Sequence, residues 1–282
     1  MTRMPEPLPS GLTPTPPTRP WRPSPWLGAA AAVHVGALGA CVASPALLPW
    51  ALGSVAATDV VLAGAGLWPR STLLGPNLRR LPASAGNVIA LTFDDGPNPA
   101  VTPAVLDLLD AYGARATFFC VGETARRHPA LLRQIVARGH AIENHTEHHW
   151  LHFSTFGPAR IAREIADAQR VLTDLAGRTP RFFRAPAGLR NPLLEPALCR
   201  QGLRLASWTR RGFDTWRNAD PDGVARRLLR GLAARDILLM HDGNPGSDRE
   251  GKPMILTVLP RVLQAIEAAG LRHVTLQEAV PA

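Results

Sequence analysis

The stretch Val88-Ile-Ala-Leu-Thr-Phe-Asp-Asp-Gly-Pro97 decides the fold, because an apolar run ends there in two adjacent carboxylates and a Gly-Pro turn. The run is short, unbroken and β-branched at its start, which is typical of a buried strand rather than a helix. Asp94 and Asp95 therefore lie where a strand opens into a loop, the usual place for chemistry in an α/β fold. Adjacent strand residues point to opposite sides unless the strand end twists. An ordinary Asp-Asp-Gly turn is the alternative interpretation.

Strand-like and helix-like segments alternate after this stretch. Ala116–Val121 is apolar and reads as a second strand, whereas Glu123–Arg138 carries its apolar residues at helical spacing and is predicted to form one helix. About seven such strands alternate with helices up to the end of the chain. This alternation predicts an α/β fold with a parallel sheet or a β/α barrel.

The chain has 282 residues, and its apolar excess is concentrated before residue 70. Residues 1–25 are rich in proline and threonine, so we predict a flexible tail. Residues 26–68 hold two apolar stretches, each long enough to cross a bilayer. Asp59 interrupts the second stretch, at a cost of roughly 2.5–3.5 kcal/mol in mid-membrane. We therefore expect a hydrophobic membrane anchor of one or two transmembrane helices at 26–68, followed by a polar linker at 69–86.

The distribution of arginines bears on the topology of this anchor. Arginines flank the apolar region on both sides, whereas the connection Pro45–Pro49 between the two stretches has none. By the positive-inside rule, two spans place the following domain on the cytoplasmic face of a bacterial inner membrane, and one span places it outside. The long proline-rich lead argues against a cleaved signal peptide. A hydrophobic hairpin buried inside a soluble domain is the other alternative.

Charge and cysteine content exclude some functions. The net charge is +9, but no basic run, stacking aromatics or nucleic-acid motif accompanies it, so we expect no nucleic-acid partner. Anionic lipid or an acidic substrate fits the charge equally well. The three cysteines are far apart and odd in number, which predicts neither a disulfide framework nor a Cys-x-x-Cys metal site. Cys120 lies in an apolar run and is expected in the core.

A histidine-rich segment follows another short strand-like stretch. His145-Thr-Glu-His-His149 places two imidazoles four residues apart, and on a helical turn these would point the same way and could hold one divalent metal ion. His148 and His152 have the same spacing and remain an alternative pair. We prefer 145 and 149 because they follow the strand end directly. Glu147 between them is interpreted as a solvated side chain.

Three more strand ends carry polar residues. Arg184-Ala-Pro-Ala-Gly188 places an arginine where it could clamp a carboxylate. Leu238-Leu-Met-His-Asp242 ends a buried strand in a histidine able to act as an acid or base near neutral pH. The loop from Trp208 to Asp214 contains arginine and aspartate. Taken singly, each has a plain structural interpretation, such as a surface arginine or a core histidine.

These motifs occur in one order, and together they resemble the five motifs of the polysaccharide deacetylase family, which carries the NodB-homology domain and is also called carbohydrate esterase family four. The resemblance covers residues 87–282. It implies a distorted (β/α) barrel with a metal-dependent amide hydrolase site. It also implies roles for particular residues. The implied metal ligands are Asp95, His145 and His149. The implied catalytic groups are Asp94 as general base, His241 as general acid, Arg184 as the partner of Asp94, and Asp214 as the partner of His241. Backbone groups near Ala187 and Leu239 are expected to contact the substrate or its oxyanion.

The chain departs from the family pattern at two motifs. The third motif has Ala187 where relatives have an aromatic residue, so a wall for stacking a sugar ring is missing. The fourth motif usually reads Asp-x-x-Asp-Trp, but here Arg211 stands in the first position and Thr215 in the last. We expect the shape of the substrate groove to differ from that of relatives.

The resemblance implies hydrolysis of the N-acetyl amide of an amino sugar in a polysaccharide, an oligosaccharide or a lipid-linked glycan. Zn²⁺ is the expected ion, and mixed nitrogen and oxygen ligands also suit other divalent transition metals. The expected partners are an N-acetylated glycan and a lipid bilayer, with no protein partner predicted. A deformylase or another non-peptide amide hydrolase of the same fold is one alternative. A non-catalytic, membrane-tethered carbohydrate-binding protein is the other.

Overall fold

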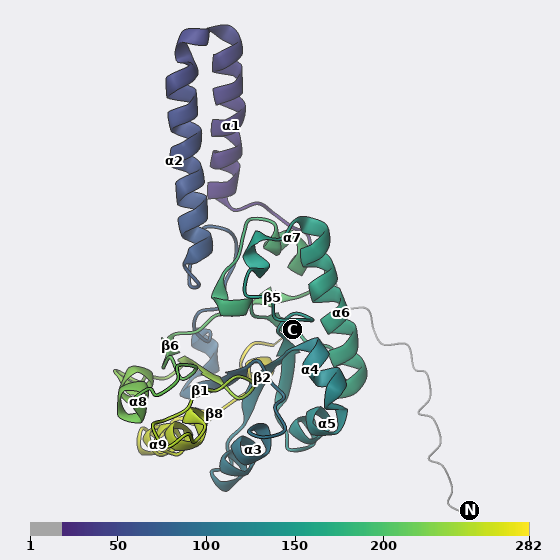
Figure 1. Ribbon diagram of the computed structural model, residues 1–282, viewed down its shortest axis with the longest axis vertical. Coiled ribbons are helices and arrows are strands. Elements are labelled where there is room, and N and C mark those ends of the chain that lie inside the picture. The colour runs from purple at the N-terminus through teal and green to yellow at the C-terminus, as the bar shows by residue number, and fades with distance from the viewer. Residues whose placement is uncertain (1–18, 282) are drawn as a thin grey trace, which may run out of the picture.

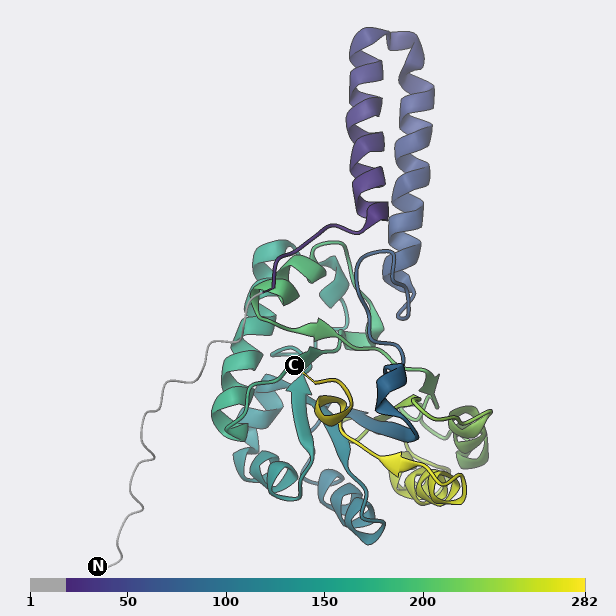
Figure 2. The same cartoon turned by 180° about the vertical axis from the view of Figure 1, so that it is seen from behind.

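The computed structural model describes residues 19–281, and residues 1–18 of the predicted tail lie outside the described residues. Two long helices, α1 (Pro25–Ala43) and α2 (Leu48–Leu67), form a hairpin around the short turn η1 (Pro45–Leu47). The hairpin projects from one end of an α/β domain, and the view from behind shows the same separation (Figures 1 and 2). The domain contains one sheet with helices packed around it.

The sheet is parallel throughout, with strand order β5-β4-β3-β2-β1-β7-β6 and β8 paired to β1. The strands are β1 (Val88–Asp94), β2 (Ala116–Cys120), β3 (Ala141–Asn144), β4 (Phe182–Phe183), β5 (Arg204–Leu205), β6 (Arg210–Arg211), β7 (Ile237–His241) and β8 (Arg272–His273). The predicted distorted α/β barrel is confirmed, as a curled half-barrel. The sheet has eight strands rather than about seven, because the two arginines of β6 give no apolar signal.

Strand β1 shows how the sheet separates two apolar layers. Its residues Ile89, Leu91 and Phe93 belong to the large cluster under the helices, whereas Val88 and Ala90 belong to the smaller cluster inside the curl. Because side chains alternate along a strand, the inward series continues through Thr92 to Asp94. The sequence pattern therefore ends with a carboxylate that faces the interior of the half-barrel.

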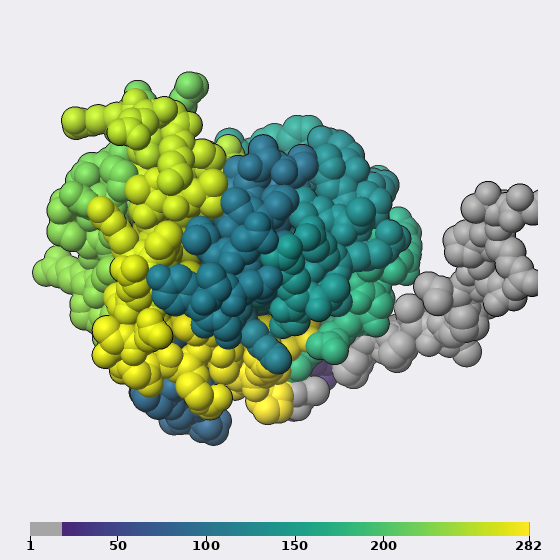
Figure 3. All heavy atoms as spheres, turned by 90° about the horizontal axis from the view of Figure 1, so that it is seen from below, coloured from purple at the N-terminus to yellow at the C-terminus, as the bar shows by residue number. Residues whose placement is uncertain are grey.

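Helices cover the outer face of the sheet. They are α3 (Thr102–Ala111), α4 (Gly122–Arg127), α5 (Pro129–Ala137), α6 (Pro158–Ala176), α7 (Leu194–Arg200), α8 (Pro221–Leu229) and α9 (Met254–Ala268). The short helix α10 (Leu276–Ala279) instead packs into the smaller cluster inside the curl, through Leu276 and Ala279. Figure 3 views the end of the domain away from the hairpin, where α9 (yellow) packs beside α3 (blue). Cys120 is fully buried in this core, as expected.

The prediction of one continuous helix after β2 is wrong. The segment Glu123–Arg138 forms two helices, α4 and α5, with His128 between them. Pro129 opens the second helix, because proline has no N–H to continue the first and is tolerated at a helix start. The short helix α7 was also missed by the periodicity.

The hairpin and its exit segment are held to the domain by specific contacts. The backbone N–H of Arg190 donates to the carbonyl of Gly66 at 3.1 Å. The predicted linker 69–86 packs onto the domain, since Leu74 and Leu81 are buried and Leu78 bridges the edge of the sheet beside β5. Most apolar side chains of the hairpin are exposed, including Val35, Leu38, Val42, Leu52 and Val60. This exposure argues against a hairpin that serves as the core of a soluble domain.

Candidate active site

Two neighbouring strands deliver the first pair of polar side chains. Asp94 ends β1 and His241 ends β7, and the two residues are directly opposite in the parallel register. Both continue the inward-facing series of their strands, and both are buried, at 3% and 7% exposure. The carboxyl ends of β1 and β7 therefore bring an acid and an imidazole to one mouth of the half-barrel.

Asp95 reaches the same mouth by a change in backbone conformation. Its φ is +73°, in the left-handed region that aspartate tolerates better than most residues. This turn removes the strict alternation expected of adjacent strand residues. Asp94 and Asp95 consequently line one pocket together.

His145 and His149 meet at Asp95. The Nε2 atom of each imidazole lies 3.1 Å from Oδ1 of Asp95, and the ring centroids are 4.8 Å apart. The expectation that a helical turn aligns them is wrong, because the segment is irregular and Thr146 and His149 both have positive φ. The loop after β3 aligns the rings instead. Burial alone raises the pKa of Asp95, but the two imidazoles outweigh it and hold the pKa well below its ordinary value.

The three side chains fit a divalent metal ion. Asp95, His145 and His149 form the only group of at least three His, Cys, Asp or Glu residues in range of a shared ion within the described part of the chain. The Nδ1 atom of His145 lies 2.8 Å from the carbonyl oxygen of Arg184. Since a carbonyl only accepts, Nδ1 carries the proton, which leaves the Nε2 lone pair directed at the cluster. Two neutral imidazoles and a carboxylate are ligands that zinc and similar ions prefer.

The alternative histidine pair is used elsewhere. His148 Nδ1 lies 3.0 Å from Oε1 of Glu164, and His152 packs edge-on against Phe156. Neither residue belongs to the cluster around Asp95. The interpretation of Glu147 as solvated is wrong, because its side chain is buried and paired with Arg126 at 2.7 Å.

Arg184 is an almost fully buried charge beside the pocket. Its side chain is 1% exposed, and its NH1 group donates to Oδ1 of Asp94 at 2.6 Å and to Oγ1 of Thr92 at 2.8 Å. Its remaining donors reach the carbonyl oxygens of Ala206 and Ser207. The guanidinium also lies 4.0 Å from the ring centroid of Phe119. These contacts fix the arginine, which in turn fixes the orientation of the Asp94 carboxylate and compensates its charge.

Asp214 accepts hydrogen bonds from His241 with both carboxylate oxygens. One accepts from Nδ1 of the imidazole at 2.9 Å and the other from the backbone N–H of His241 at 2.8 Å. Burial lowers the pKa of His241, but the Asp214 carboxylate outweighs it, and the nearby Asp95 and Asp94 add to it, so the pKa rises to about 9. His241 is therefore protonated near neutral pH, with Nε2 free of this contact and available to donate.

This ion pair predicts a pH effect. Because the folded pKa of His241 lies above its ordinary value of 6.5, the pair stabilises the fold fully below pH 6.5 and loses that contribution as pH rises through about 9. The substitution Asp214→Asn removes the carboxylate that raises the pKa of His241, whereas the burial that lowers this pKa remains. We expect the alkaline fall of activity to move down by roughly 1–3 pH units. A pH profile of kcat/KM for both proteins measures this shift, and coinciding alkaline limbs would contradict the role given to His241.

Asp94, Asp95, His145, His149 and His241 line a small pocket of about 130 Å³, and Arg184 and Asp214 support it from behind Asp94 and His241. Ala187, whose backbone is left-handed at φ +54°, and Leu239 form part of its wall. Sequence reasoning missed Leu151 and Asn244, which also line it. Their positions just beyond the histidine segment and just beyond the end of β7 were the available signal.

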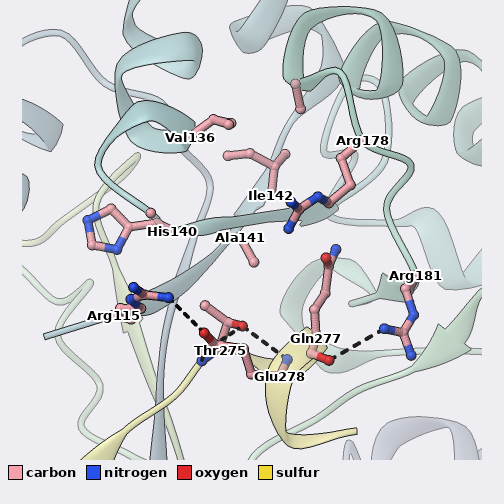
Figure 4. Close-up of a pocket in the computed structure, with 12 residues that line it drawn as sticks. Arg115, Val136, His140, Ala141, Ile142, Arg178, Arg181, Thr275, Gln277 and Glu278 are labelled. Carbon is pink, nitrogen blue, oxygen red and sulfur yellow. Dashed lines mark hydrogen bonds and ion pairs between the residues drawn. The ribbon is translucent and has the colours of Figure 1, made fainter. Parts of the chain in front are cut away.

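A larger cavity, of about 520 Å³, lies at the opposite ends of the strands. Figure 4 shows Arg115, Arg178 and Arg181 around it, near the starts of β2 and β4. Two of the three arginines are already engaged, since Arg115 pairs with Glu278 at 2.9 Å and Arg181 donates to backbone carbonyls. This cavity lacks the paired carboxylates and imidazoles, so its size does not make it the catalytic centre.

Fold and site together define a class: a curled parallel α/β half-barrel with a cluster of acids and imidazoles at the carboxyl ends of its strands. Comparisons with known proteins place the chain within that class. The family model described as polysaccharide deacetylase matches residues 82–206. The chain belongs to the polysaccharide deacetylase family, as the order of its motifs predicted.

Individual relatives agree with this assignment. The peptidoglycan-N-acetylglucosamine deacetylase of Bacillus cereus is 33% identical over 192 residues, covering 68% of this chain and 87% of the relative. The chitooligosaccharide deacetylase of Azorhizobium caulinodans is 35% identical over 189 residues, covering 64% of this chain and 89% of the relative. Among solved structures, the Bc1960 peptidoglycan N-acetylglucosamine deacetylase superimposes with a TM-score of 0.65 at 26% identity, covering 72% of this chain and 92% of that one. The segment matched by the family model, residues 82–206, begins after the hairpin.

Proposed function

We propose that this protein is a membrane-anchored, metal-dependent deacetylase that hydrolyses the N-acetyl amide of an amino sugar in a glycan. The observation that carries the proposal is the convergence of Asp94, Asp95, His145, His149 and His241 on one pocket. Relatives named as peptidoglycan and chitooligosaccharide deacetylases support the reaction class.

The proposed roles follow from the contacts of each side chain. Asp95, His145 and His149 would hold a divalent ion, most simply Zn²⁺. Such an ion supplies Lewis-acid polarisation of the amide carbonyl and acidifies a nearby water. Asp94, held by Arg184 at 2.6 Å, takes the proton of the attacking water. Ala187 and Leu239 form part of the pocket wall, which would face the acetamido group and the developing oxyanion.

His241 completes the reaction as the general acid. The amine leaving the tetrahedral intermediate is a poor leaving group until it is protonated, so a proton donor on its side of the pocket lowers the barrier. The imidazolium form favoured by Asp214 supplies that proton. Asp94 and His241 act from neighbouring strands, which allows the base and the acid to flank one amide.

The proposed metal ligands predict a stability effect that is measurable without any substrate. An ion bound only by the folded protein raises the free energy of unfolding by RT ln(1 + [L]/Kd), about 2.7 kcal/mol at a hundredfold excess over Kd. We expect Zn²⁺ to raise the melting temperature of protein that a chelator has stripped of metal, and to change the melting temperature of His149→Ala little. His148→Ala, which alters a histidine outside the cluster, should keep the response. Equal responses in all three proteins would remove the proposed site.

A substrate panel tests the reaction itself. Purified full-length protein in detergent or nanodiscs should release acetate from N-acetylated glucosamine oligosaccharides. Formate release from the N-formylated counterparts at a higher kcat/KM would favour the deformylase alternative, which the altered third and fourth motifs motivate. If neither acid is released with metal present, the non-catalytic carbohydrate-binding alternative gains, although the complete set of five site residues argues against it.

The anchor supports a membrane location. Both hairpin helices are long and apolar enough to span a bilayer, and both are largely exposed. Asp59 lies 3.3 Å from His34 of the facing helix, so the polar group that interrupts the second stretch has a partner inside the hairpin. Two spans return the chain to its starting side, with Arg22 and Arg70 close to the helix ends on that side. We therefore propose that the domain lies on the cytoplasmic face of a bacterial inner membrane. A reporter enzyme fused to the C-terminus tests the side.

A further inference from the structure

The active-site pocket lies against the base of the hairpin. A Cβ atom placed at Gly188, a pocket residue, would come within 2.7 Å of the ring of Pro69, which is two residues beyond the end of α2. Arg70 donates to the carbonyl oxygen of Thr209 at 3.0 Å, in the segment that leads to the pocket residue Arg211. If α1 and α2 cross a bilayer, the pocket therefore lies within a few residues of the membrane surface.

The exposed apolar side chains of the domain gather at the same end. Outside the hairpin, the large exposed hydrophobic residues of the described chain lie in two places only, the segments flanking the hairpin and the loops after β3, β4 and β6. They are Trp21, Trp68, Leu73, Trp150, Leu151, Leu193 and Trp216. Leu151 is 70% exposed and lines the pocket. Tryptophan and leucine in these positions suit the headgroup layer of a bilayer, where amphipathic rings prefer to lie.

The pocket also carries a cation without an anionic partner. Arg211 lines it, and no carboxylate of the described residues lies within ion-pair distance of this guanidinium. The guanidinium instead lies over the rings of Phe213 and Trp208, at 4.8 and 5.6 Å from their centroids, and its Nε atom is buried without a hydrogen bond. Aromatic stacking holds an arginine in place while leaving its planar edge free for a bidentate anion such as phosphate.

We propose that the substrate is an anionic glycolipid, an amino sugar joined through phosphate to a membrane-embedded lipid, and that Arg211 binds the phosphate. This inference rests on the proposed deacetylase function and specifies its substrate class. The hairpin holds the pocket at the bilayer surface, the apolar rim rests in the headgroup layer, and the small pocket admits the acetamido group while the phosphate stays at Arg211. The missing aromatic wall at Ala187 agrees with this arrangement, because a single lipid-held sugar depends less on stacking than a polymer threaded through a groove.

The test compares three substrates with the same sugar, using full-length protein in nanodiscs. They are N-acetylglucosaminyl phosphate on a prenyl chain, soluble N-acetylglucosamine 1-phosphate, and a neutral N-acetylated chitooligosaccharide. We expect the prenyl-linked substrate to have the highest kcat/KM. Arg211→Gln should raise KM for the prenyl-linked substrate about 10- to 100-fold, the loss expected for a hydrogen-bonded charge pair, with a smaller effect on the neutral one. Arg178→Gln, at the far end of the sheet, is the matched control and should change neither.

A binding measurement tests the glycolipid substrate separately from the deacetylase reaction. Metal-free protein in nanodiscs should bind the prenyl-linked substrate more tightly than Arg211→Gln does, whether or not acetate is later released. Acetate release with equal preference for all three substrates, and no selective effect of Arg211→Gln, would overturn the glycolipid inference and leave the deacetylase proposal standing. Selective binding without acetate or formate release would keep the glycolipid site and overturn the reaction. A preference for the soluble sugar phosphate over the prenyl-linked form would show phosphate recognition without a lipid and would overturn the membrane part.

Discussion

Asp94→Asn should lower kcat for acetate release by roughly 10²- to 10⁴-fold, the range expected when a general base is removed. The amide keeps the shape of the carboxylate but cannot accept the proton of the attacking water. The position ends β1 and faces the pocket, so the substitution acts at the reacting atoms rather than through the surface. Acetate release by the folded fraction, measured with saturating substrate and metal, reports the effect.

A neighbouring carboxylate provides the matched control for this variant. Asp242 is also fully buried and follows His241, but it points toward Thr102, whose hydroxyl donates to it, and it does not line the pocket. Burial raises the pKa of Asp242 to about 7, so an amide is a close mimic of its protonated form. We expect Asp242→Asn to lower kcat by less than about tenfold, well short of the loss of a general base. Equal losses in both variants would indicate a general packing effect and would remove Asp94 from the mechanism.

Arg184→Met should destabilise the fold by about 3–5 kcal/mol, because it leaves a buried carboxylate without its partner. Asp94 is 3% exposed and cannot recover its solvation from water. Chemical denaturation of both proteins at pH 7 measures the loss. A change below about 1 kcal/mol, the size of a surface pair, would mean that the contact contributes little.

A second variant distinguishes stability from catalysis at this pair. In Arg184→Met with Asp94→Leu, the charge pair is replaced by apolar side chains, an exchange that is often neutral for stability. We expect the double variant to regain much of the lost stability and to remain inactive. Such a result would assign the ion pair to the chemistry of the site rather than to the stability of the fold.

The fold could be predicted because its signals are local and apolar. An unbroken strand such as Val88–Asp94 marks a buried parallel sheet without any knowledge of its neighbours. The two-residue strand β6 is held by the sheet around it, and its two arginines carry no apolar signal of their own. The break at Pro129 had a visible cause, but the helical spacing of the apolar residues that follow it concealed the break.

The motifs predicted most residues of the candidate site, but not its geometry. The order of the motifs named the residues, whereas the left-handed turn at Asp95 and the irregular loop that aligns His145 and His149 are tertiary features. A sequence cannot show that Glu147 is buried against Arg126, because both side chains belong to segments that look exposed. Nor could it show that Arg211 stacks on aromatic rings with no carboxylate of residues 19–281 beside it.

One metal ion held by Asp95, His145 and His149 should support amide hydrolysis by Asp94 and His241. Metal can be titrated into full-length protein that a chelator has stripped of metal, with the ion content and acetate release recorded together. We expect activity to rise in proportion to bound metal and to saturate near one ion per chain, and we expect His149→Ala not to recover activity. Full acetate release from protein shown to contain no metal would contradict it.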